Sequence, residues 1–321
     1  MVPWLPAAPN DLGLEFPGKG KHIVFLAGDE EYRSEELLPA LARMLSERDG
    51  FRCTVLFSID DRGLVNPNWQ TNQPGMEALR TADLCVMMLR FRRWPDHQMK
   101  EFVDYYESGR PIIALRTSTH AFAYPAGSTY ARYGWQSTEW PGGFGKQVLG
   151  ETWVSHWGNH GVQATRGIAV DKHLIRSGVK DLFGTTDVYE AAPPADAKII
   201  FRGEVVSGLR PTDPPAEGRK KTSKGVEQPL NAPMMPILWT REPQNGKQFQ
   251  RIVTCTMGAA TDFLNPGMRK VFANSIRWCL KRTKQVSSEF VGPYNPSPFG
   301  FDKFVRDKKP SYFSGSSSGT K

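Results

Sequence analysis

HIVFLAGDEEYRSEELLPALARMLSERDG, residues 22–50, decides the fold of this chain. Its first six residues are almost all apolar, as expected for a strand that is covered on both faces. A polar turn follows, and then an amphipathic helix with Gly50 as its stop signal. The apolar stripe of that helix consists of Leu37, Leu38, Leu41, Met44 and Leu45. The stretch therefore predicts the opening of a βαβ unit.

Three further apolar runs continue this pattern. Residues 53–59, 84–89 and 111–116 are expected strands, and roughly 25 to 30 residues separate neighbouring strands, which leaves room for one crossover helix each. The clearest of these helices is expected at 95–109, between a Pro-Asp start signal and a glycine stop. Later strands are expected at 167–170, 198–202, 236–240 and 250–257, with a final helix at 266–282. The sequence thus predicts an α/β protein with a flavodoxin-like three-layer fold and a mainly parallel central sheet.

Composition divides the chain into one domain and two extensions. We expect an N-terminal extension over residues 1–20, the α/β domain over 21–283 and a C-terminal extension over 284–321. Within the domain, the Pro- and Gly-rich stretch 208–232 is expected to form a long surface loop. The chain closes on SGSSSGTK, and this end is expected to be disordered.

The net charge of +8 does not by itself indicate a nucleic-acid partner. The densest basic run, Arg219, Lys220, Lys221 and Lys224, falls inside the predicted surface loop, and no DNA- or RNA-binding motif accompanies it. We therefore expect this run to be solvated and the protein to bind no nucleic acid.

The longest apolar runs are about six residues, far short of the roughly 20 that span a bilayer, so no membrane insertion is expected. The first 20 residues as written do not have the pattern of a secretory signal. A cytoplasmic location is expected on that basis, or a periplasmic or exported one if a signal peptide has been removed.

Polar side chains follow the expected parallel strands, where such sheets bind their ligands. Glu31 and Arg33 come after the first strand, Arg90 after the third, and the cluster Arg116-Thr117-Ser118-Thr119-His120 after the fourth. The competing interpretation is structural, with acids that favour a helix start, arginines on the surface and a buried histidine.

His120, His156 and His160 fall within one stretch of 41 residues. His120 is the candidate general acid or base, because imidazole titrates near neutrality. Three histidines also suit a catalytic zinc ion, yet the HExxH signature is absent and Gly158 argues against a helical pair. A zinc site with His120, His156 and His160 as ligands stays an alternative, and no cofactor is certain. The GxSxG elbow of serine hydrolases is also absent.

Eight segments together resemble the ThuA-like, or trehalose-utilisation, family, and most closely its variants in planctomycete-type bacteria. They are HIVFLAGDEEYRSEE, RFR, ALRTSTHAF, FGKQVLGETWVSHWGNHG, TDVYE, PMMPILWTR, TCTMGAATDF and NSIRWCL, in consistent order from about Lys21 to Lys281. The resemblance implies a class I glutamine-amidotransferase-like fold and a link to trehalose or another disaccharide through 3-keto-sugar intermediates. It implies these cleft residues: Glu31, Arg33, Arg90, Arg116, His120, Asp187 and Tyr189.

The chain also departs from the family pattern. Shorter ThuA proteins have Gly-His-Glu near the end of the last strand, where this sequence has Gly258-Ala259-Ala260. The segment RTSTH holds no amidotransferase cysteine, so glutamine hydrolysis is not expected.

These observations favour an enzyme that acts on a disaccharide or its 3-keto derivative by histidine-assisted proton transfer. His120, Glu31 and Asp187 are its expected catalytic residues. The expected substrate-binding residues are Arg33, Arg90, Arg116, Thr117, Thr119, Tyr189, His156 and His160. The alternative is a non-catalytic carbohydrate-binding accessory protein of the same fold, which the two alanines favour. A homo-oligomer, and cooperation with a sugar 3-dehydrogenase, are open alternatives for its partners.

Overall fold

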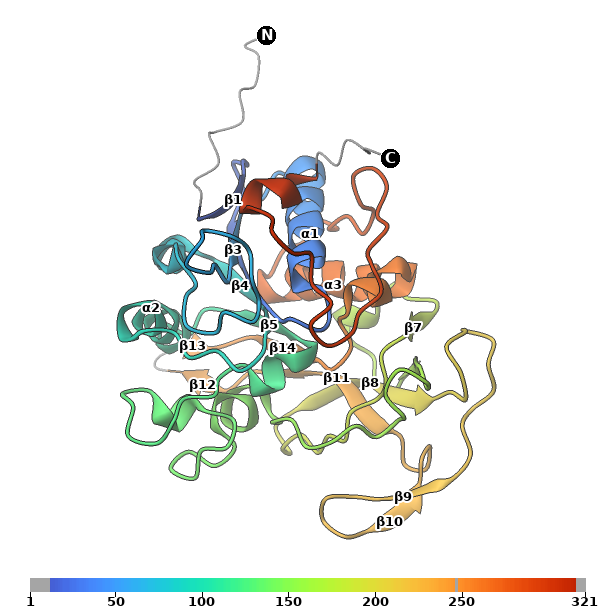
Figure 1. Ribbon diagram of the computed structural model, residues 1–321. Coiled ribbons are helices and arrows are strands. Elements are labelled where there is room, and N and C mark those ends of the chain that lie inside the picture. Colours follow the sequence, from blue (N-terminus) through green and yellow to red (C-terminus); the bar gives the residue numbers. More distant parts are fainter. Residues whose placement is uncertain (1–11, 246–247, 316–321) are drawn as a thin grey trace.

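A ten-stranded sheet forms the centre of the computed structural model, which describes residues 12–245 and 248–315 (Figure 1). Its spatial order is β1-β3-β2-β4-β5-β14-β11-β8-β6-β7. The strands are β1 (Gly13–Phe16), β2 (His22–Gly28), β3 (Arg52–Phe57), β4 (Leu84–Leu89), β5 (Ile112–Leu115), β6 (Thr165–Ala169), β7 (Leu182–Gly184), β8 (Lys198–Val205), β11 (Met235–Arg241) and β14 (Ile252–Cys255).

The five strands β3-β2-β4-β5-β14 are parallel to one another. Numbered along the chain, they stand in the order 2-1-3-4-5, which is the order of flavodoxin-like sheets. The predicted flavodoxin-like α/β fold is therefore confirmed. Its topological switch point lies between β2 and β4, and ligands of such folds bind beside the carboxyl ends of the strands at this point.

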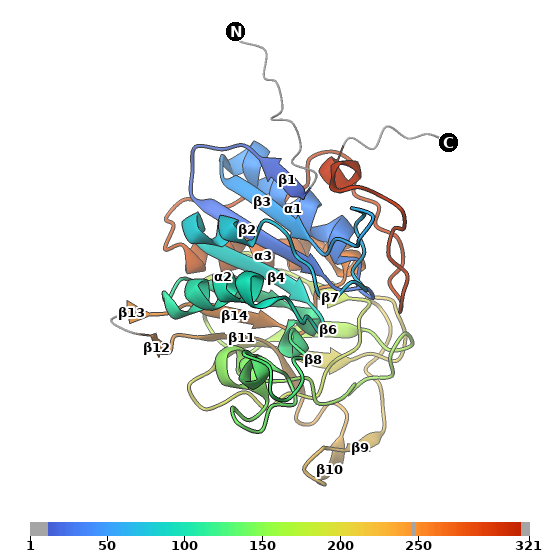
Figure 2. The same ribbon diagram turned by 60° about the vertical axis from the view of Figure 1, so that its left-hand side comes forward.

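Helices cover both faces of the sheet and make three layers (Figure 2). Helices α1 (Ser34–Asp49) and α3 (Pro266–Cys279) pack on one face, and α2 (Asp96–Glu107) with the turn η1 (Met76–Thr81) packs on the other. Alternate residues of β2 enter the two cores, with Phe25 on the α1 side and Leu26 on the α2 side. Each such side chain, fully buried, stabilises the fold by roughly 1.5–3 kcal/mol.

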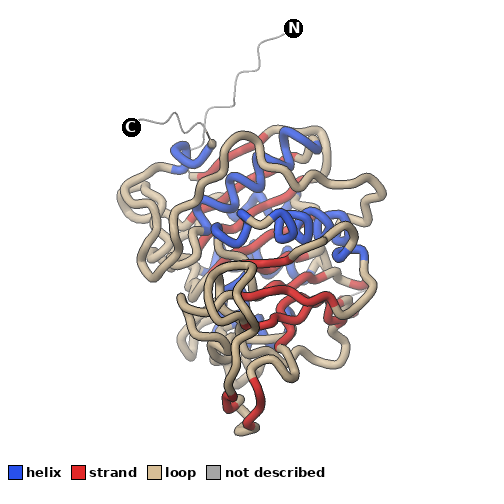
Figure 3. The backbone as a smooth tube through the Cα atoms, turned by 90° about the vertical axis from the view of Figure 1, so that its right-hand side faces the viewer, coloured by secondary structure: helices blue, strands red, loops and turns tan. Residues whose placement is uncertain are grey.

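Antiparallel strands extend the sheet at both edges. β1 pairs with β3, so residues 13–16 of the predicted N-terminal extension lie in the sheet. They do so because Leu14 and Phe16 bury their side chains in the α1 core. Within the predicted surface loop, the hairpin of β9 (Arg219–Lys221) and β10 (Glu227–Pro229) lies at the margin of the molecule (Figure 3). It is hydrogen-bonded to the body of the domain, since Lys220 Nζ donates to the His156 carbonyl at 2.6 Å and the Ser223 hydroxyl donates to Glu190 at 2.7 Å.

The C-terminal segment runs back past α1 and closes in the turn η7 (Pro310–Ser314) (Figure 1). Residues 316–321, which include most of the end predicted to be disordered, lie outside the described residues. The remaining elements are the strand pair β12 (Gln244–Asn245) and β13 (Gln248–Phe249) and the short helical turns η2 (Arg116–His120), η3 (Ala131–Tyr133), η4 (Gly145–Leu149), η5 (Leu174–Arg176) and η6 (Ala260–Leu264). Among the described helices, none is both long and apolar enough to cross a membrane.

Candidate functional site

The segments that follow β2, β4 and β5 meet at the switch point of the sheet. The Arg90 amide donates to the Gly28 carbonyl at 2.9 Å, and the Phe91 amide donates to the His120 carbonyl at 3.1 Å. The Arg90 guanidinium also pairs with the Glu30 carboxylate across the switch point. Three polar segments that are distant in the sequence are thus locked together where this fold binds ligands.

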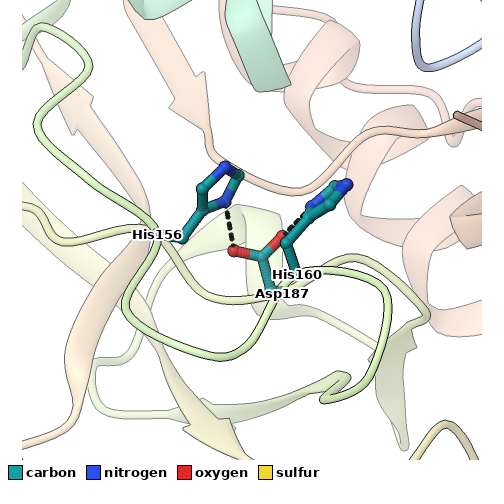
Figure 4. A group of neighbouring side chains, drawn as sticks. All are labelled: His156, His160 and Asp187. Atoms are coloured by element: carbon teal, nitrogen blue, oxygen red, sulfur yellow. Dashed lines mark hydrogen bonds and ion pairs between the residues drawn. The ribbon is translucent and has the colours of Figure 1, made fainter. Parts of the chain in front are cut away.

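Asp187 is the centre of the most tightly connected polar group at this edge (Figure 4). Its Oδ1 accepts from Arg116 Nη2 at 2.7 Å and lies 3.0 Å from His160 Nδ1. Its Oδ2 lies 2.8 Å from His156 Nδ1. Burial by itself would raise the pKa of the Asp187 carboxyl, but the Arg116 charge and the two imidazoles hold it well below its usual value. Asp187 is therefore a carboxylate at neutral pH.

Arg116 is fully buried and uses both of its terminal nitrogens on protein acceptors. Nη1 donates to the carbonyls of Asp187 and Thr256, and Nη2 donates to the Tyr32 hydroxyl as well as to Asp187. The Tyr189 ring lies under the guanidinium, 3.7 Å away. Arg116 and Tyr189, predicted to bind substrate, are both buried and in contact with each other, and Arg116 is hydrogen-bonded to Asp187.

His160 bridges two carboxylates. Its Nδ1 faces Asp187, and its Nε2 lies 3.1 Å from Glu31 Oε1. The hydrogen bonds to Asp187 and Glu31 raise the pKa of His160 to about 9. Because a carboxylate can only accept, both ring nitrogens carry protons, and His160 is an imidazolium at neutral pH. Glu31 is therefore joined to Asp187 through His160.

His156 has one nitrogen held and one free. Its Nδ1 donates to Asp187, which fixes the tautomer and leaves a lone pair on Nε2 in the neutral ring. Within the described residues, Nε2 has no hydrogen-bond partner, and the side chain is partly exposed. An imidazole oriented by a buried carboxylate through one nitrogen is a proton acceptor at the other.

His120 is buried among aromatic rings. Phe91, Trp135 and Trp153 surround it at ring-centroid distances of 5.1, 6.4 and 5.8 Å. Burial, followed by the positive charges of Arg90 and Arg116, lowers the pKa of His120 well below its usual value, so the ring is neutral. The Thr119 hydroxyl lies 3.2 Å from its Nδ1. The neighbouring Thr117 hydroxyl is hydrogen-bonded to the Asp29 carboxylate.

Seven side chains follow one another around a closed circuit at this edge, each within 6 Å of the next between ring centroids or between guanidinium and centroid. We call this circuit the site ring. Its members, in order, are Arg90, Phe301, His160, His156, Trp153, His120 and Phe91. The ring joins two imidazoles that can carry a proton, one imidazolium, one arginine and three aromatic surfaces.

The structure brings most of the predicted residues together, but Arg33 stands apart. Its Nε donates to the Pro298 carbonyl at 3.1 Å, and its guanidinium lies near Glu35 and Glu36 of α1. Arg33, predicted to bind substrate, therefore joins the C-terminal segment to α1.

The ligand atoms of His156, His160 and Asp187 lie within 4.8 Å of one another and could hold a metal ion. This group shares His156 and His160 with the three-histidine zinc alternative and has Asp187 in place of His120. Both Nδ1 atoms already face Asp187. A metal ion bound here would have to displace at least one of these hydrogen bonds.

Sequence reasoning missed four residues of the site, one of which is Phe91 of the site ring. Tyr32 shares Arg116 with Asp187, and Trp153 and Phe301 complete the site ring. Tyr32 and Trp153 stood inside quoted motifs, but nothing in their spacing distinguished them from core aromatics. Phe301 lies in the predicted C-terminal extension, where the sequence contains no periodic pattern.

The Gly258-Ala259-Ala260 departure has a structural counterpart. Ala259 and Ala260 are fully buried, and the Ala260 carbonyl accepts from the hydroxyl of Tyr294 in the C-terminal segment at 2.9 Å. The Asp262 carboxylate accepts from the amides of Gly258, Ala259 and Thr186. This turn therefore supports the residue before Asp187 and offers no proton carrier at the two alanines.

The chain superposes on the crystal structure of a "putative thua-like protein" from Bacteroides uniformis ATCC 8492 with a TM-score of 0.51 and 14% identity, over 86% of this chain and 95% of that one. The chain has the fold of a ThuA-like protein. A second such protein, from Parabacteroides merdae ATCC 43184, gives a TM-score of 0.48 at 14% identity, over 89% of this chain and 96% of that one. The mmIFT52 N-terminal domain gives 0.44 at 13% identity, over 81% and 97%. No protein-family model and no curated protein matches the chain.

Proposed function

We propose that the protein acts on a carbohydrate, a disaccharide or its 3-keto derivative, by histidine-assisted proton transfer. The observation that carries this proposal is the orientation of His156, whose Nδ1 is held by buried Asp187 while its Nε2 stays free on the site ring. Neutral His120 is the second proton carrier, on the far side of Trp153. Asp187, Glu31 and Arg116 act as positioning residues.

The proposed step begins at a carbon beside the ketone of the sugar. His156 Nε2 removes the proton of that carbon, the C–H electron pair forms a C=C bond, and the carbonyl oxygen takes the negative charge. Arg90 can stabilise this oxygen electrostatically, because its Nη2 has no hydrogen-bond partner among residues 12–245 and 248–315. The imidazolium then returns the proton, either to carbon in an isomerisation or to the oxygen of a departing group in an elimination.

The surroundings of His156 support a sugar as the ligand. Trp153, Phe91 and Trp135 contact one another or the catalytic imidazoles and are partly exposed. Such rings give a sugar an apolar face, while Arg90 and His156 offer polar contacts. A keto sugar must be supplied by an oxidation, so a sugar 3-dehydrogenase is the proposed functional partner. Within the ThuA-like group, we propose that the chain is of the planctomycete-type variant, with a class I glutamine-amidotransferase-like fold.

The second candidate is a non-catalytic carbohydrate-binding accessory protein. Ala259 and Ala260 are buried and stand where shorter ThuA proteins have His and Glu. They favour the accessory protein, because a methyl side chain can neither donate nor accept a proton. The two functions differ in turnover and share binding.

A ligand experiment separates them. Purified protein in deuterated buffer is mixed separately with trehalose and 3-ketotrehalose and followed by proton NMR, with His120→Ala beside the wild type. Product formation by the wild type that is weakened in the variant supports the enzyme. Line broadening of either sugar without any product supports the accessory protein. The absence of both product and line broadening would contradict a carbohydrate function.

A further inference from the structure

The C-terminal segment crosses the carboxyl edge of the sheet and is anchored there at both ends of residues 298–305. Upstream, the Pro298 carbonyl accepts from Arg33 Nε at 3.1 Å, and the Gly300 amide donates to the Glu31 carbonyl at 2.9 Å. Downstream, the Val305 amide donates to buried Glu35 Oε1 at 3.1 Å. The backbone between these anchors is therefore held over the site.

Two phenylalanines of this segment meet the site differently. Phe299 packs inward against Tyr32 and His160, at 5.2 and 6.0 Å between ring centroids. Phe301 contacts His160 at 5.9 Å and lies under the Arg90 guanidinium at 5.0 Å, yet 55% of its surface is exposed. Phe299 thus has a packing role, whereas most of Phe301 faces solvent beside the imidazoles.

The Arg90 guanidinium is fixed between two rings. It lies 4.8 Å from the Phe91 centroid and 5.0 Å from the Phe301 centroid, and Glu30 holds its Nη1. The contact with Arg90 orients the Phe301 ring, since a cation prefers the face of an aromatic ring. A ring that is held in place and left uncovered is suited to stack against a ligand.

We propose that Phe301 is a specificity-determining residue that stacks against the second sugar unit of a disaccharide-sized ligand. This inference rests on the proposed carbohydrate function and adds to it the residue that contacts the second sugar unit. The first sugar unit lies against His156 and Trp153, and the second extends along the site ring past His160 to Phe301. The C-terminal segment, which the sequence placed outside the domain, thereby completes the binding site.

The test measures the dissociation constants of trehalose and glucose by calorimetry for the wild type, Phe301→Ala and Phe301→Trp. Phe249→Ala is the matched control, because Phe249 is also exposed, at 66%. It lies on β13, which directly precedes the amino end of β14, whereas the site lies at the carboxyl ends of the strands. We expect Phe301→Ala to raise the dissociation constant of trehalose about tenfold and to leave that of glucose unchanged. Phe301→Trp and Phe249→Ala should keep the wild-type affinity for both sugars. Melting temperatures of all variants report whether the fold is retained.

Three results would overturn the inference. If Phe301→Ala weakens the binding of trehalose and of glucose equally, Phe301 contacts both sugars alike and does not select for the second sugar unit. If it does not weaken the binding of trehalose, Phe301 takes no part in sugar binding. In either case the wild type still binds sugar, so the proposed function survives. A wild type that binds neither sugar would overturn the inference together with the proposed function.

Discussion

His156 Nδ1 lies 2.8 Å from the Oδ2 atom of Asp187, and this contact joins two segments that are 31 residues apart. Asp187 is buried and charged, and His156 is partly exposed and has a free Nε2. The pair therefore fixes the His156 ring beside Trp153, at 5.8 Å between ring centroids.

Removing the charge that holds Asp187 should destabilise the protein. Arg116→Met leaves a buried carboxylate without its guanidinium, and we expect a loss of about 3–5 kcal/mol in the free energy of unfolding. The matched control is Arg132→Met, since Arg132 also pairs with a carboxylate and lies over aromatic rings, but on the surface. Its loss should stay under about 1 kcal/mol. Urea denaturation measures both, and equal losses would contradict the central role of the Arg116–Asp187 pair.

His160 should stabilise the fold in a pH-dependent way. Its pKa is raised to about 9 in the folded protein, against an ordinary value of 6.5. A raised pKa means that the folded state binds the proton more tightly, so the stabilisation is full below pH 6.5 and is lost as the pH rises through about 9. The stability difference between wild type and His160→Gln should shrink over that window. NMR of the His160 ring should show a titration midpoint near pH 9. A midpoint near pH 6.5 would refute the bridge to Asp187 and Glu31.

Glu35 should have the opposite effect on stability. Burial raises the pKa of this carboxyl from 4.5 to about 8. The folded state therefore resists ionisation, and a penalty develops between pH 4.5 and 8 that is absent at lower pH. Glu35→Gln keeps an acceptor for the Val305 amide, so we expect it to stabilise the protein at pH 8 by about 1–4 kcal/mol and to have no such effect near pH 4.

Glu47→Gln on the same helix is the control for Glu35→Gln. Glu47 is exposed and paired with Arg43, so its substitution should change stability by less than about 0.5 kcal/mol at either pH. Thermal unfolding at the two pH values is the measurement. A gain for Glu35→Gln that does not depend on pH would show that ionisation of Glu35 is not its cause.

Chelation should leave proton transfer intact. In the proposed step the Nδ1 atoms of His156 and His160 both donate hydrogen bonds to Asp187, and no metal ion takes part. We expect activity to survive dialysis against EDTA. Loss of activity that zinc restores, together with about one equivalent of bound zinc by elemental analysis, would assign His156, His160 and Asp187 to a metal site instead.

The fold could be predicted because its decisive signals are local. Strands β2 and β4 are nearly all apolar and fully buried, and α1 has a clear apolar stripe, so each element is visible without its neighbours. β1 escaped prediction because an edge strand of four residues, GLEF, shows little pattern. Its place depends on pairing with β3, which the chain reaches only after α1.

The sequence pointed to several of the residues that meet at this edge, but not to the contacts between them. Strand ends pointed to Arg90, Arg116 and His120, since parallel strands bring their carboxyl ends together. The positive φ of 46° at Arg116, and its partners on distant segments, turn that side chain inward. His156 gained its role from Asp187, across a loop without periodicity, and this pairing is a tertiary contact that single-sequence reasoning does not reach.

The most direct test of the proton-transfer account is the rate at which the carbon beside the ketone of 3-ketotrehalose takes up deuterium from solvent. It is measured by NMR with wild-type protein, His156→Gln and the control His97→Gln, which changes an exposed histidine of α2. The account predicts uptake by the wild type and by His97→Gln, and at least a hundredfold slower uptake by His156→Gln. Equal rates for His156→Gln and the wild type would contradict it.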